Sequence, residues 1–311
     1  SIIVKFCKLV NIPLYEIQRN LIELRSGGFP NGGNRSLPIF PKFPIELTKE
    51  LARILAHLFG DGCLTINKKG HYNCQYYYQS YELREMFKID VKKIFGEIQI
   101  HEAVNKNTPY IFLPAPVTII MLKLVPTFNS KLSKVPKFIK SASNNIKKEF
   151  IKAFMDDEAS VSFRPPHRHV ELALSNKQLL NDVKDLLKKL NIKISNVYEK
   201  TLRGKYKVYY FYIRGQQNLH EFWENIGFYH PEKTEKLNKI IESPGRTSYA
   251  HGETRELILE LLKNEPSTSL ELSRMLNRKQ TTINFFLWKL RKDSKVKLLK
   301  HDNKTLWKVI R

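Results

Sequence analysis

The sequence predicts an α+β fold in which one αββαββα unit occurs twice, related by a pseudo-twofold axis. Two stretches of similar pattern support this: LARILAHLFGDGCL at 51–64 and FIKAFMDDEASVSF at 150–163. Each is an apolar helix that ends in an acid, Asp61 or Glu158, and runs on into a strand-like segment. The acids lie 97 residues apart (158 − 61), about one unit of helices and strands. A repeat at fixed spacing is the signature of a duplicated unit.

Small residues indicate that the two helices pack closely. Ala52, Ala56 and Gly60 recur every four residues in the first helix, and the second has Ala153; such spacing allows two helix backbones to approach. Gly62 is suited to a left-handed helix stop. Side-by-side packing would bring the two acids to one pole, about 4–8 Å apart, where they would suit a hard cation such as Mg²⁺. Either stretch alone is as well explained as a core helix with a polar end.

The pair of stretches resembles the LAGLIDADG homing endonucleases, of the single-chain, two-motif, archaeal or intein-like type. The first copy is ILAHLFGDG at 54–62 and the second is KAFMDDEA at 152–159; the resemblance covers roughly residues 46–243. It implies a saddle of antiparallel sheets on duplex DNA, in which Asp61 and Glu158 bind Mg²⁺, or another divalent cation, and catalyse phosphodiester hydrolysis.

The resemblance also implies a basic or amide residue close to each acid. Those positions hold Gln79 and Ser175 rather than lysine, and Lys177 follows two residues after Ser175. The predicted catalytic residues are therefore Asp61, Glu158, Gln79 and Lys177. The absence of lysine and the replacement of the motif glycine by Ala159 count against catalysis, especially in the second half.

Charge points to nucleic acid as the partner. The 311 residues hold 53 Lys and Arg against 30 Asp and Glu, a net charge of +23. Such an excess favours a polyanion, because the lysine-rich surfaces of thermophile proteins normally carry matching glutamates. No apolar run has membrane-spanning length, and the three cysteines form no disulfide framework. We expect a cytoplasmic, nucleoid-associated protein without a membrane partner.

Periodicity and turn residues divide the chain into five segments. They are a helical segment (1–28), a Pro/Gly linker (29–45), a first half (46–145), a second half (146–243) and a C-terminal domain (253–311). Residues 1–28 fit either part of a helix-turn-helix or a packing appendage. Residues 253–311, three helices followed by a hairpin, resemble a winged helix, which binds either DNA or protein.

Strand parity places polar side chains on one face of each sheet, and basic residues in the turns. This face fits either a solvated sheet or a surface that reads the major groove; the net charge favours the second. The predicted DNA-binding residues of the sheets are Thr65, Asn67, Lys68, Lys69, Asn73, Gln75, Tyr77, Ser160, Ser162, Arg164, Arg168, His169, Glu171, Lys200, Arg203, Lys205 and Lys207. Those of the C-terminal domain are Arg278, Lys279, Thr281, Thr282 and Asn284.

The expected function is a monomeric, Mg²⁺-dependent, site-specific endonuclease of double-stranded DNA. One alternative is a catalytically impaired transcription regulator on the same scaffold, and another is an RNA-splicing maturase, with RNA as its partner. The retained acids favour the nuclease. The missing lysines and the winged helix favour the regulator.

Overall fold

The computed structural model describes residues 22–24, 38–67, 70–164, 167–202, 204–243, 253–301 and 304–310. The chain divides into two compact units, which we call the N-terminal unit (Ser1–Ile240) and the C-terminal unit (Ile241–Arg311). Apart from 22–24 and 38–45, the helices and linker expected in residues 1–45 lie outside the described residues.

The first half of the N-terminal unit has the predicted order of elements. It comprises α3 (Lys49–Phe59), β1 (Gly62–Ile66), β2 (Tyr72–Tyr77), α4 (Tyr81–Phe95), β3 (His101–Asn105), β4 (Thr108–Leu113) and α5 (Ala115–Leu124). Helix α3 begins after Thr48, whose hydroxyl accepts a hydrogen bond from the Leu51 amide at 3.3 Å. A side chain in this position satisfies an amide that the helix itself leaves unpaired.

The second half repeats this order after a short helix. It comprises α6 (Lys137–Ser141), α7 (Asn144–Glu158), β5 (Ala159–Arg164), β6 (His167–Leu174), α8 (Lys177–Lys189), β7 (Tyr198–Leu202), β8 (Tyr206–Arg214), α9 (Gln216–Asn225) and α10 (Pro231–Glu242).

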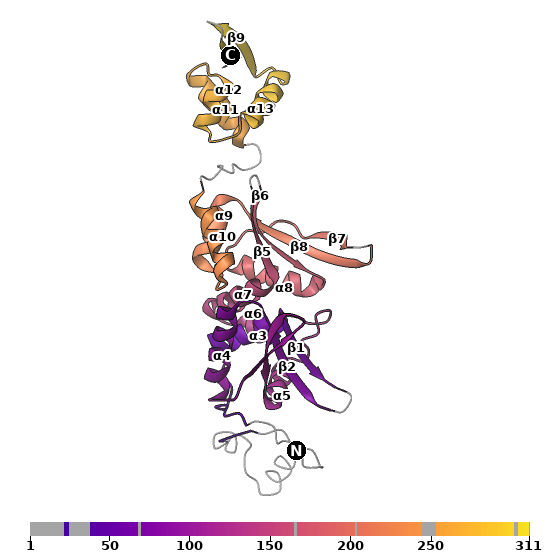
Figure 1. Ribbon diagram of the computed structural model, residues 1–311. Coiled ribbons are helices and arrows are strands. Elements are labelled where there is room, and N and C mark those ends of the chain that lie inside the picture. Colours follow the sequence, from indigo (N-terminus) through magenta and orange to yellow (C-terminus); the bar gives the residue numbers. More distant parts are fainter. Residues whose placement is uncertain are drawn as a thin grey trace. The chain divides into compact units, whose positions relative to one another are not determined.

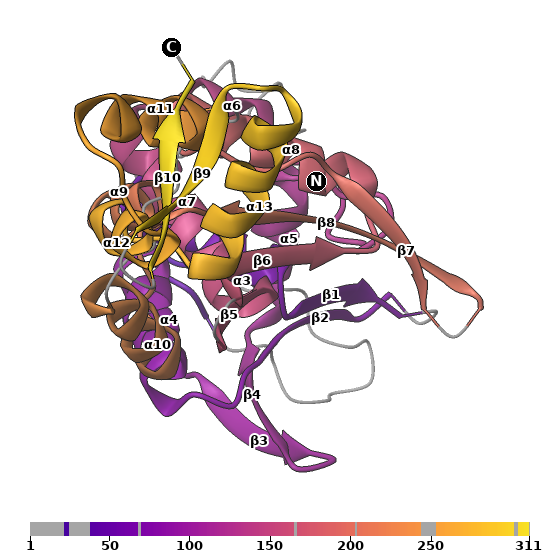
Figure 2. The ribbon, with the colours of Figure 1, turned by 90° about the horizontal axis from the view of Figure 1, so that it is seen from above.

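The two halves form antiparallel four-stranded sheets of equivalent topology. The strand orders are β1-β2-β4-β3 and β5-β6-β8-β7, so the strand that follows each motif helix is an edge strand. Helices α4 and α10 lie on one side of the unit, and the strands of both sheets lie on the other (Figures 1 and 2). The predicted α+β fold with a duplicated half is confirmed.

Helices α3 and α7 pack directly against each other. Their small residues Ala52, Ala56 and Ala153 are fully buried, as the spacing predicts. At the carboxyl end of α3, a Cβ built on Gly60 would lie 2.7 Å from both Cβ and Oδ2 of Asp157. No residue other than glycine fits at position 60 unless α7 moves.

The expected role of Gly62 as a left-handed stop is wrong. The α3 cap is Gly60, with φ −77°, and the positive-φ residues of the described chain do not include Gly62. A glycine is required at 62 because its Cβ would lie 2.4 Å from the Leu58 Cα. Strand parity also predicts that Ile66 faces the helices, but it is 53% exposed at the free end of the edge strand β1.

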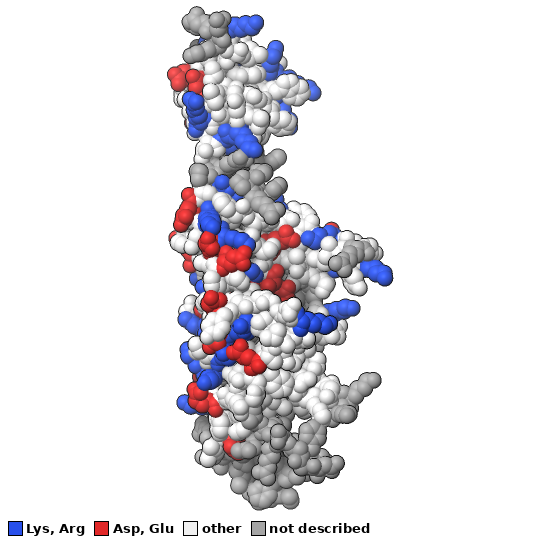
Figure 3. Space-filling view, viewed as in Figure 1, with Lys and Arg blue, Asp and Glu red and all other residues white. Residues whose placement is uncertain are grey.

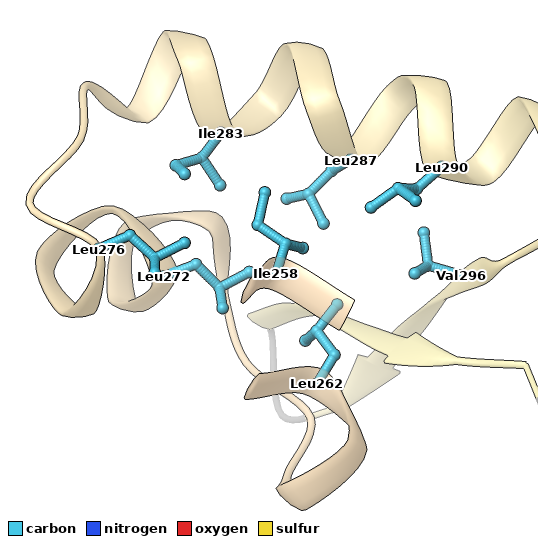
Figure 4. Close-up of a cluster of buried hydrophobic side chains, with 8 residues drawn as sticks. All are labelled: Ile258, Leu262, Leu272, Leu276, Ile283, Leu287, Leu290 and Val296. Carbon is cyan, nitrogen blue, oxygen red and sulfur yellow. The ribbon is translucent and has the colours of Figure 1, made fainter. Parts of the chain in front are cut away.

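The C-terminal unit has its own apolar core. It contains α11 (Glu253–Asn264), α12 (Ser269–Met275), α13 (Gln280–Lys292) and the antiparallel pair β9 (Val296–His301) and β10 (Lys304–Val309). Ile258, Leu272, Ile283 and Leu287 are fully buried between the helices (Figure 4). A bridge between Ser267 and Trp307 adds a third short strand segment to the hairpin.

No helix in the described part of the chain is both long and apolar enough to span a membrane.

Candidate functional site

Asp61 and Glu158 lie at equivalent ends of the two packed helices. Asp61 follows the Gly60 cap of α3, and Glu158 is the last residue of α7. Asp61 is exposed and Glu158 is half-buried. Among the described residues, neither carboxylate accepts a hydrogen bond or forms an ion pair. The structure leaves both acids open for a ligand.

The environment raises the pKa of both acids. Burial is the larger cause for Asp61, with Asp157 adding to it, and the pKa rises from 3.8 to about 7. The pKa of Glu158 rises from 4.5 to about 7 through burial and then through the charges of Asp61 and Asp157. Asp61 is therefore accessible yet surrounded by enough protein to be desolvated, as expected of a side chain in a concave surface. Acids without structural partners and with strongly raised pKa values are typical of functional sites.

A pocket of about 120 Å³ adjoins Glu158. Gly60 of the first half and Ser175 and Asn176 of the second half line it. This volume holds several water molecules. No group of three or more His, Cys, Asp or Glu within the described ranges is arranged to hold a metal ion by itself. Asp61 and Glu158 alone do not amount to such a group.

We call the end of the helix pair that carries Asp61 and Glu158 the pole. A buried polar cluster supports the pole from inside the interface between α3 and α7. Nδ1 of His57 on α3 lies 3.1 Å from both carboxylate oxygens of Asp157 on α7. The hydroxyl of Tyr76 on β2 donates to Asp157 Oδ1 at 2.9 Å. His57 and Tyr76 are fully buried, as is the Asp157 carboxylate. This cluster ties β2 and both motif helices together directly behind the two acids.

Asp156 connects α7 to the closing helix α10. Its carboxylate accepts hydrogen bonds from the backbone amides of Tyr229 (3.0 Å) and His230 (2.9 Å), just before α10 begins. Its carbonyl oxygen accepts from the Tyr78 hydroxyl at 2.5 Å and from Nζ of Lys233. Burial lowers the pKa of Lys233, and four carboxylates, those of Asp61 and Glu158 included, oppose this effect. Lys233 therefore supplies positive charge close to the pole.

Three residues were expected close to the acids: Gln79, Ser175 and Lys177. Of these, Ser175 lines the pocket beside Glu158. The Gln79 amide donates instead to the carbonyl of Asn107, in the β3–β4 turn, at 3.1 Å. Nζ of Lys177 lies over the Tyr209 ring, 5.3 Å from its centroid. Both side chains are therefore engaged by neighbours within their own halves.

The predicted DNA-facing residues of the first sheet share one face. Cys74 and Tyr76 of β2 are buried, and Asn73, Gln75 and Tyr77 between them are half-buried on the opposite face. The Tyr77 hydroxyl donates to Gln75 Oε1 at 3.0 Å. The neighbouring Thr65 and Asn67 are exposed. Lys68 and Lys69 lie outside the described residues.

The second sheet repeats this arrangement. Val170 and Leu172 of β6 are buried, and the alternate residues His169 and Glu171 are half-buried. Glu171 Oε1 accepts from Nζ of Lys200 at 3.5 Å, so part of the basic charge on this face is neutralised. The remaining predicted residues of this sheet lie in β5, β6 or the β7–β8 hairpin: Ser160, Ser162, Arg164, Arg168, Lys205 and Lys207.

Three of the predicted DNA-binding residues of the second half are arginines. Arg203 and the side chain of Arg164 lie outside the described part of the structure. Arg168 lies over the Phe163 ring, 5.8 Å from its centroid. Lys and Arg side chains are visible beside the projecting end of the β7–β8 hairpin (Figure 3).

In the C-terminal unit, Lys279 caps α13, and Thr281 and Asn284 are exposed in its first turns, whereas Thr282 is half-buried. Arg278 is half-buried and its Nη2 lies 3.4 Å from the Thr254 hydroxyl, so it is partly engaged within the unit.

Four residues of the pole were not predicted from the sequence: His57, Asp156, Asp157 and Lys233. The polar pair Asp156-Asp157 inside an apolar helix was an available signal, because charged residues are rarely buried without a partner. Nothing in the local sequence around Lys233 indicates its proximity to the acids.

Comparison with known proteins agrees with this geometry. Residues 145–227 match the family model described as a LAGLIDADG-like domain. The chain is 28% identical over 109 residues to the homing endonuclease I-ApeI of Aeropyrum pernix, a match that covers 35% of this chain and 47% of the relative.

Two further relatives are much longer proteins. The replication factor C small subunit of Thermococcus kodakarensis is 27% identical over 207 residues, which are 66% of this chain and 23% of that protein. The DNA-directed RNA polymerase subunit Rpo1N of Methanocaldococcus jannaschii is 27% identical over 223 residues, which are 60% of this chain and 16% of that protein. The chain thus spans less than a quarter of either.

Among solved structures, I-DmoI in complex with DNA and Ca aligns with a TM-score of 0.46 and 13% identity, over 61% of this chain and 97% of the other. Full-length DUF199/WhiA from Thermatoga maritima aligns with a TM-score of 0.45 and 15% identity, over 89% and 96%. The family model therefore identifies residues 145–227 as a LAGLIDADG-like domain, and the first half of the unit repeats its order of helices and strands.

Proposed function

We propose that this protein is a site-specific DNA endonuclease that hydrolyses phosphodiester bonds with a divalent cation, Mg²⁺ or one like it. The observation that carries the proposal is the state of Asp61 and Glu158. Both carboxylates have raised pKa values and no hydrogen-bond or ion-pair partner among the described residues, although the neighbouring Asp156 and Asp157 are fully engaged. A carboxylate that is desolvated and has no partner lowers the stability of the folded protein. Such acids are found at catalytic sites, and a catalytic role would explain why this chain retains them.

The two acids fit a cation that is shared with the substrate. Mg²⁺ usually keeps waters and binds through one or two carboxylates together with substrate phosphates, rather than in an all-protein cage. The open pair of Asp61 and Glu158 matches this pattern, and the pocket beside Glu158 has room for water. When bound, the ion would supply charge stabilisation and activate water. The chain would contribute the two ligands, held in place by the cluster of His57, Asp157 and Tyr76.

The polar faces of the two sheets are the proposed DNA-binding surfaces. Asn73, Gln75 and Tyr77 on one sheet and His169 and Glu171 on the other present donors and acceptors on one face of each sheet. Such groups match those displayed by base pairs in the major groove. The lysines and arginines of the hairpins would contact phosphates and set the position of the protein on the duplex.

The relatives support an endonuclease of the homing type. One similar segment occurs in a replication factor subunit and in an RNA polymerase subunit, and occupies 23% and 16% of their lengths. We infer that this segment is an insertion in both proteins with an activity of its own, and a further relative, I-ApeI, is a homing endonuclease.

The test is cleavage of a plasmid library of randomised sites by the full chain, with Mg²⁺ or with EDTA, followed by sequencing of the ends. We expect Mg²⁺-dependent cleavage at one sequence. Asp61→Asn and Glu158→Gln should each abolish cleavage yet bind the selected site in Ca²⁺, because the sheets supply the affinity. Asp185→Asn, which changes an exposed acid on α8, is the matched control and should cleave normally. Full cleavage by the Asp61→Asn/Glu158→Gln double variant would exclude this active site.

A second candidate is sequence-specific DNA binding without cleavage. It is favoured by the engagement of Gln79 with Asn107 and of Lys177 with Tyr209, since neither side chain is left free to assist the acids. Binding to one selected sequence, together with no cleavage in Mg²⁺, Mn²⁺ or Ca²⁺, would favour this candidate.

We further propose that the C-terminal unit is a winged helix that binds DNA. The order of three helices and a hairpin supports this assignment. So does the bridge from Ser267, in the α11–α12 connection, to Trp307 of the hairpin. Lys279, Thr281 and Asn284 would then contact DNA from the amino end of α13. Removal of residues 244–311 should shorten the footprint and reduce the salt dependence of binding. An unchanged footprint would instead make the unit a protein-docking or packing module.

A further inference from the structure

The outward face of α13 carries two large aromatic side chains. Ile283, Leu287 and Leu290 form its buried face (Figure 4). Phe285 and Trp288 point the opposite way, because helical periodicity turns them by about half a circle from the core residues. Phe285 is 52% exposed and Trp288 is 60% exposed. The two rings lie three residues apart on one helix face and so form a contiguous apolar patch, and such patches mark interaction sites.

Lysines accompany both rings. Nζ of Lys289 lies 4.6 Å from the centroid of Phe285, and Nζ of Lys292 lies 5.8 Å from that of Trp288. Helix α13 contains no acid, and Asp293, which follows it, pairs with Arg255 at 2.5 Å. From residue 278 to 311 the chain has eleven Lys and Arg against two Asp. This charge fits a polyanion and opposes a basic protein partner.

The chemistry of the face favours unpaired bases over a duplex. A helix in the major groove meets base edges, which present hydrogen-bonding groups and, as an apolar feature, the thymine methyl. Flat rings offer little to such edges. Rings interleaved with cations are instead the arrangement that binds single strands, where bases stack on aromatic side chains and cations take the phosphates.

The spacing of the Phe285 and Trp288 rings also allows each to stack with one base of a single strand. Residues three apart on a helix have Cβ atoms roughly 5–6 Å apart, more than the rise of about 3.4 Å per nucleotide in a stacked strand. Two successive bases would therefore be splayed, one on each ring. The flexible stems of Lys289 and Lys292 allow their ammonium groups to move from the rings to neighbouring phosphates.

We propose that the face of α13 formed by Phe285, Trp288, Lys289 and Lys292 is a binding site for single-stranded nucleic acid, with one base stacked on each ring. The site shares no residue with the proposed cleavage centre and does not depend on nuclease activity. Either a displaced DNA strand or RNA offers the same chemistry.

The experiment measures binding of fluorescein-labelled dT12 and rU12, and of a dT12·dA12 duplex, to the full chain by anisotropy. The variants are Phe285→Ala and Trp288→Ala, and Trp288→Phe is the conservative variant that retains a ring. The matched control is Trp223→Ala, which removes an exposed tryptophan (40%) from α9 in the other unit. All these variants keep the charge of the protein, and thermal unfolding checks that each is folded.

Stacking contributes about 1–3 kcal/mol per base, so each alanine variant should bind the single strands roughly 5- to 150-fold more weakly. Trp288→Phe should restore most of the affinity, and Trp223→Ala should not change it. Duplex binding, which we assign to the sheets and to the amino end of α13, should fall much less than single-strand binding in the alanine variants. Comparison of dT12 with rU12 identifies which strand is preferred. Unaltered single-strand affinity in both alanine variants would overturn the proposal. An equal loss on the duplex would also overturn it, because it would indicate groove contacts. Self-association of the wild type that either alanine variant abolishes would assign the rings to a protein interface instead.

Discussion

The Gly60 backbone lies directly against the side chain of Asp157, so that a Cβ at position 60 would be 2.7 Å from Asp157 Cβ. This contact occurs at the end of the motif helices, one residue before each acid. The separation of α3 and α7 at the pole is therefore set by the absence of a side chain on one helix. A change in this separation would move Asp61 relative to Glu158.

Gly60→Ala should destabilise the N-terminal unit and impair the site. Overpacking of this kind costs about 1–3 kcal/mol, which corresponds to a decrease in Tm of about 2–4 °C per kcal/mol. Thermal unfolding of the full chain measures this decrease in Tm. Gly70→Ala is the comparison, because nothing lies within 4 Å of its added methyl group and its cost comes from a φ of +77° alone. If Gly60→Ala costs no more than Gly70→Ala, the helices do not approach as described.

A second prediction concerns the buried hydroxyl of Tyr76. Tyr76→Phe removes the 2.9 Å hydrogen bond to Asp157 and leaves the carboxylate with His57. Loss of a hydrogen bond to a charged group costs about 1.5–3 kcal/mol. Tyr77→Phe, on the opposite face of the same strand, removes a hydroxyl that is bonded to Gln75 and should cost much less. Equal effects of the two changes on the free energy of unfolding would show that Asp157 does not depend on Tyr76.

The duplicated halves follow from the sequence because hydrophobic periodicity and turn residues are local signals. The stretches 51–64 and 150–163 each carry their helix, its acid and the following strand within fourteen residues. The alternation in β2 likewise identified Asn73, Gln75 and Tyr77 as one face. The equivalent positions of Asp61 and Glu158 at the ends of the two helices were predictable because the repeat itself brings them into correspondence.

The supporting cluster was not predictable, because its members are distant in sequence. Asp157 is 100 residues from His57 and 81 from Tyr76. No local pattern distinguishes these partners from other histidines and tyrosines of the chain. Gly62 was misinterpreted for a related reason: the requirement comes from the Leu58 backbone and not from a left-handed φ. Both the buried cluster and the need for glycine at position 62 depend on contacts that form only in the folded protein.

Glu158 should make stability depend on pH in metal-free buffer. Its pKa in the folded protein is about 7 against an ordinary value of 4.5, mainly through burial. Between these values the folded state binds more protons than the unfolded state, so stability falls as the pH rises. Glu158→Gln removes this contribution and should stabilise the protein at pH 8 by on the order of 1 kcal/mol.

The measurement is Tm in EDTA at pH 8 and near pH 4, for the wild type and Glu158→Gln. Near pH 4 both forms of the wild type, folded and unfolded, bind the proton, and the difference between the two proteins should disappear. Asp185→Asn, on the exposed surface of α8, is the control and should not shift this dependence. A stabilisation that is the same at both pH values would have another origin than the ionisation of Glu158.

The last prediction concerns Lys233, whose ammonium group donates to the carbonyl of Asp156 and lies among the carboxylates of the pole. Lys233→Met removes positive charge that lowers the pKa of both Asp61 and Glu158. Their pKa values should therefore rise further, and the pH of half-maximal cleavage should move upward. Tm in EDTA should fall more at pH 8 than at pH 5, because repulsion between the carboxylates requires their ionised forms.

Lys236→Met on the same helix is the matched control, since Lys236 is exposed and pairs with Glu232 in solvent. It should change Tm little and equally at both pH values, because surface ion pairs contribute about 0–1 kcal/mol. Glu158→Gln combined with Lys233→Met should recover part of the loss at pH 8, since one of the uncompensated carboxylates is then absent. If Lys233→Met lowers Tm equally at pH 5 and pH 8, its role is confined to the hydrogen bond that joins α10 to α7. The charge of the pole would then be balanced by other groups.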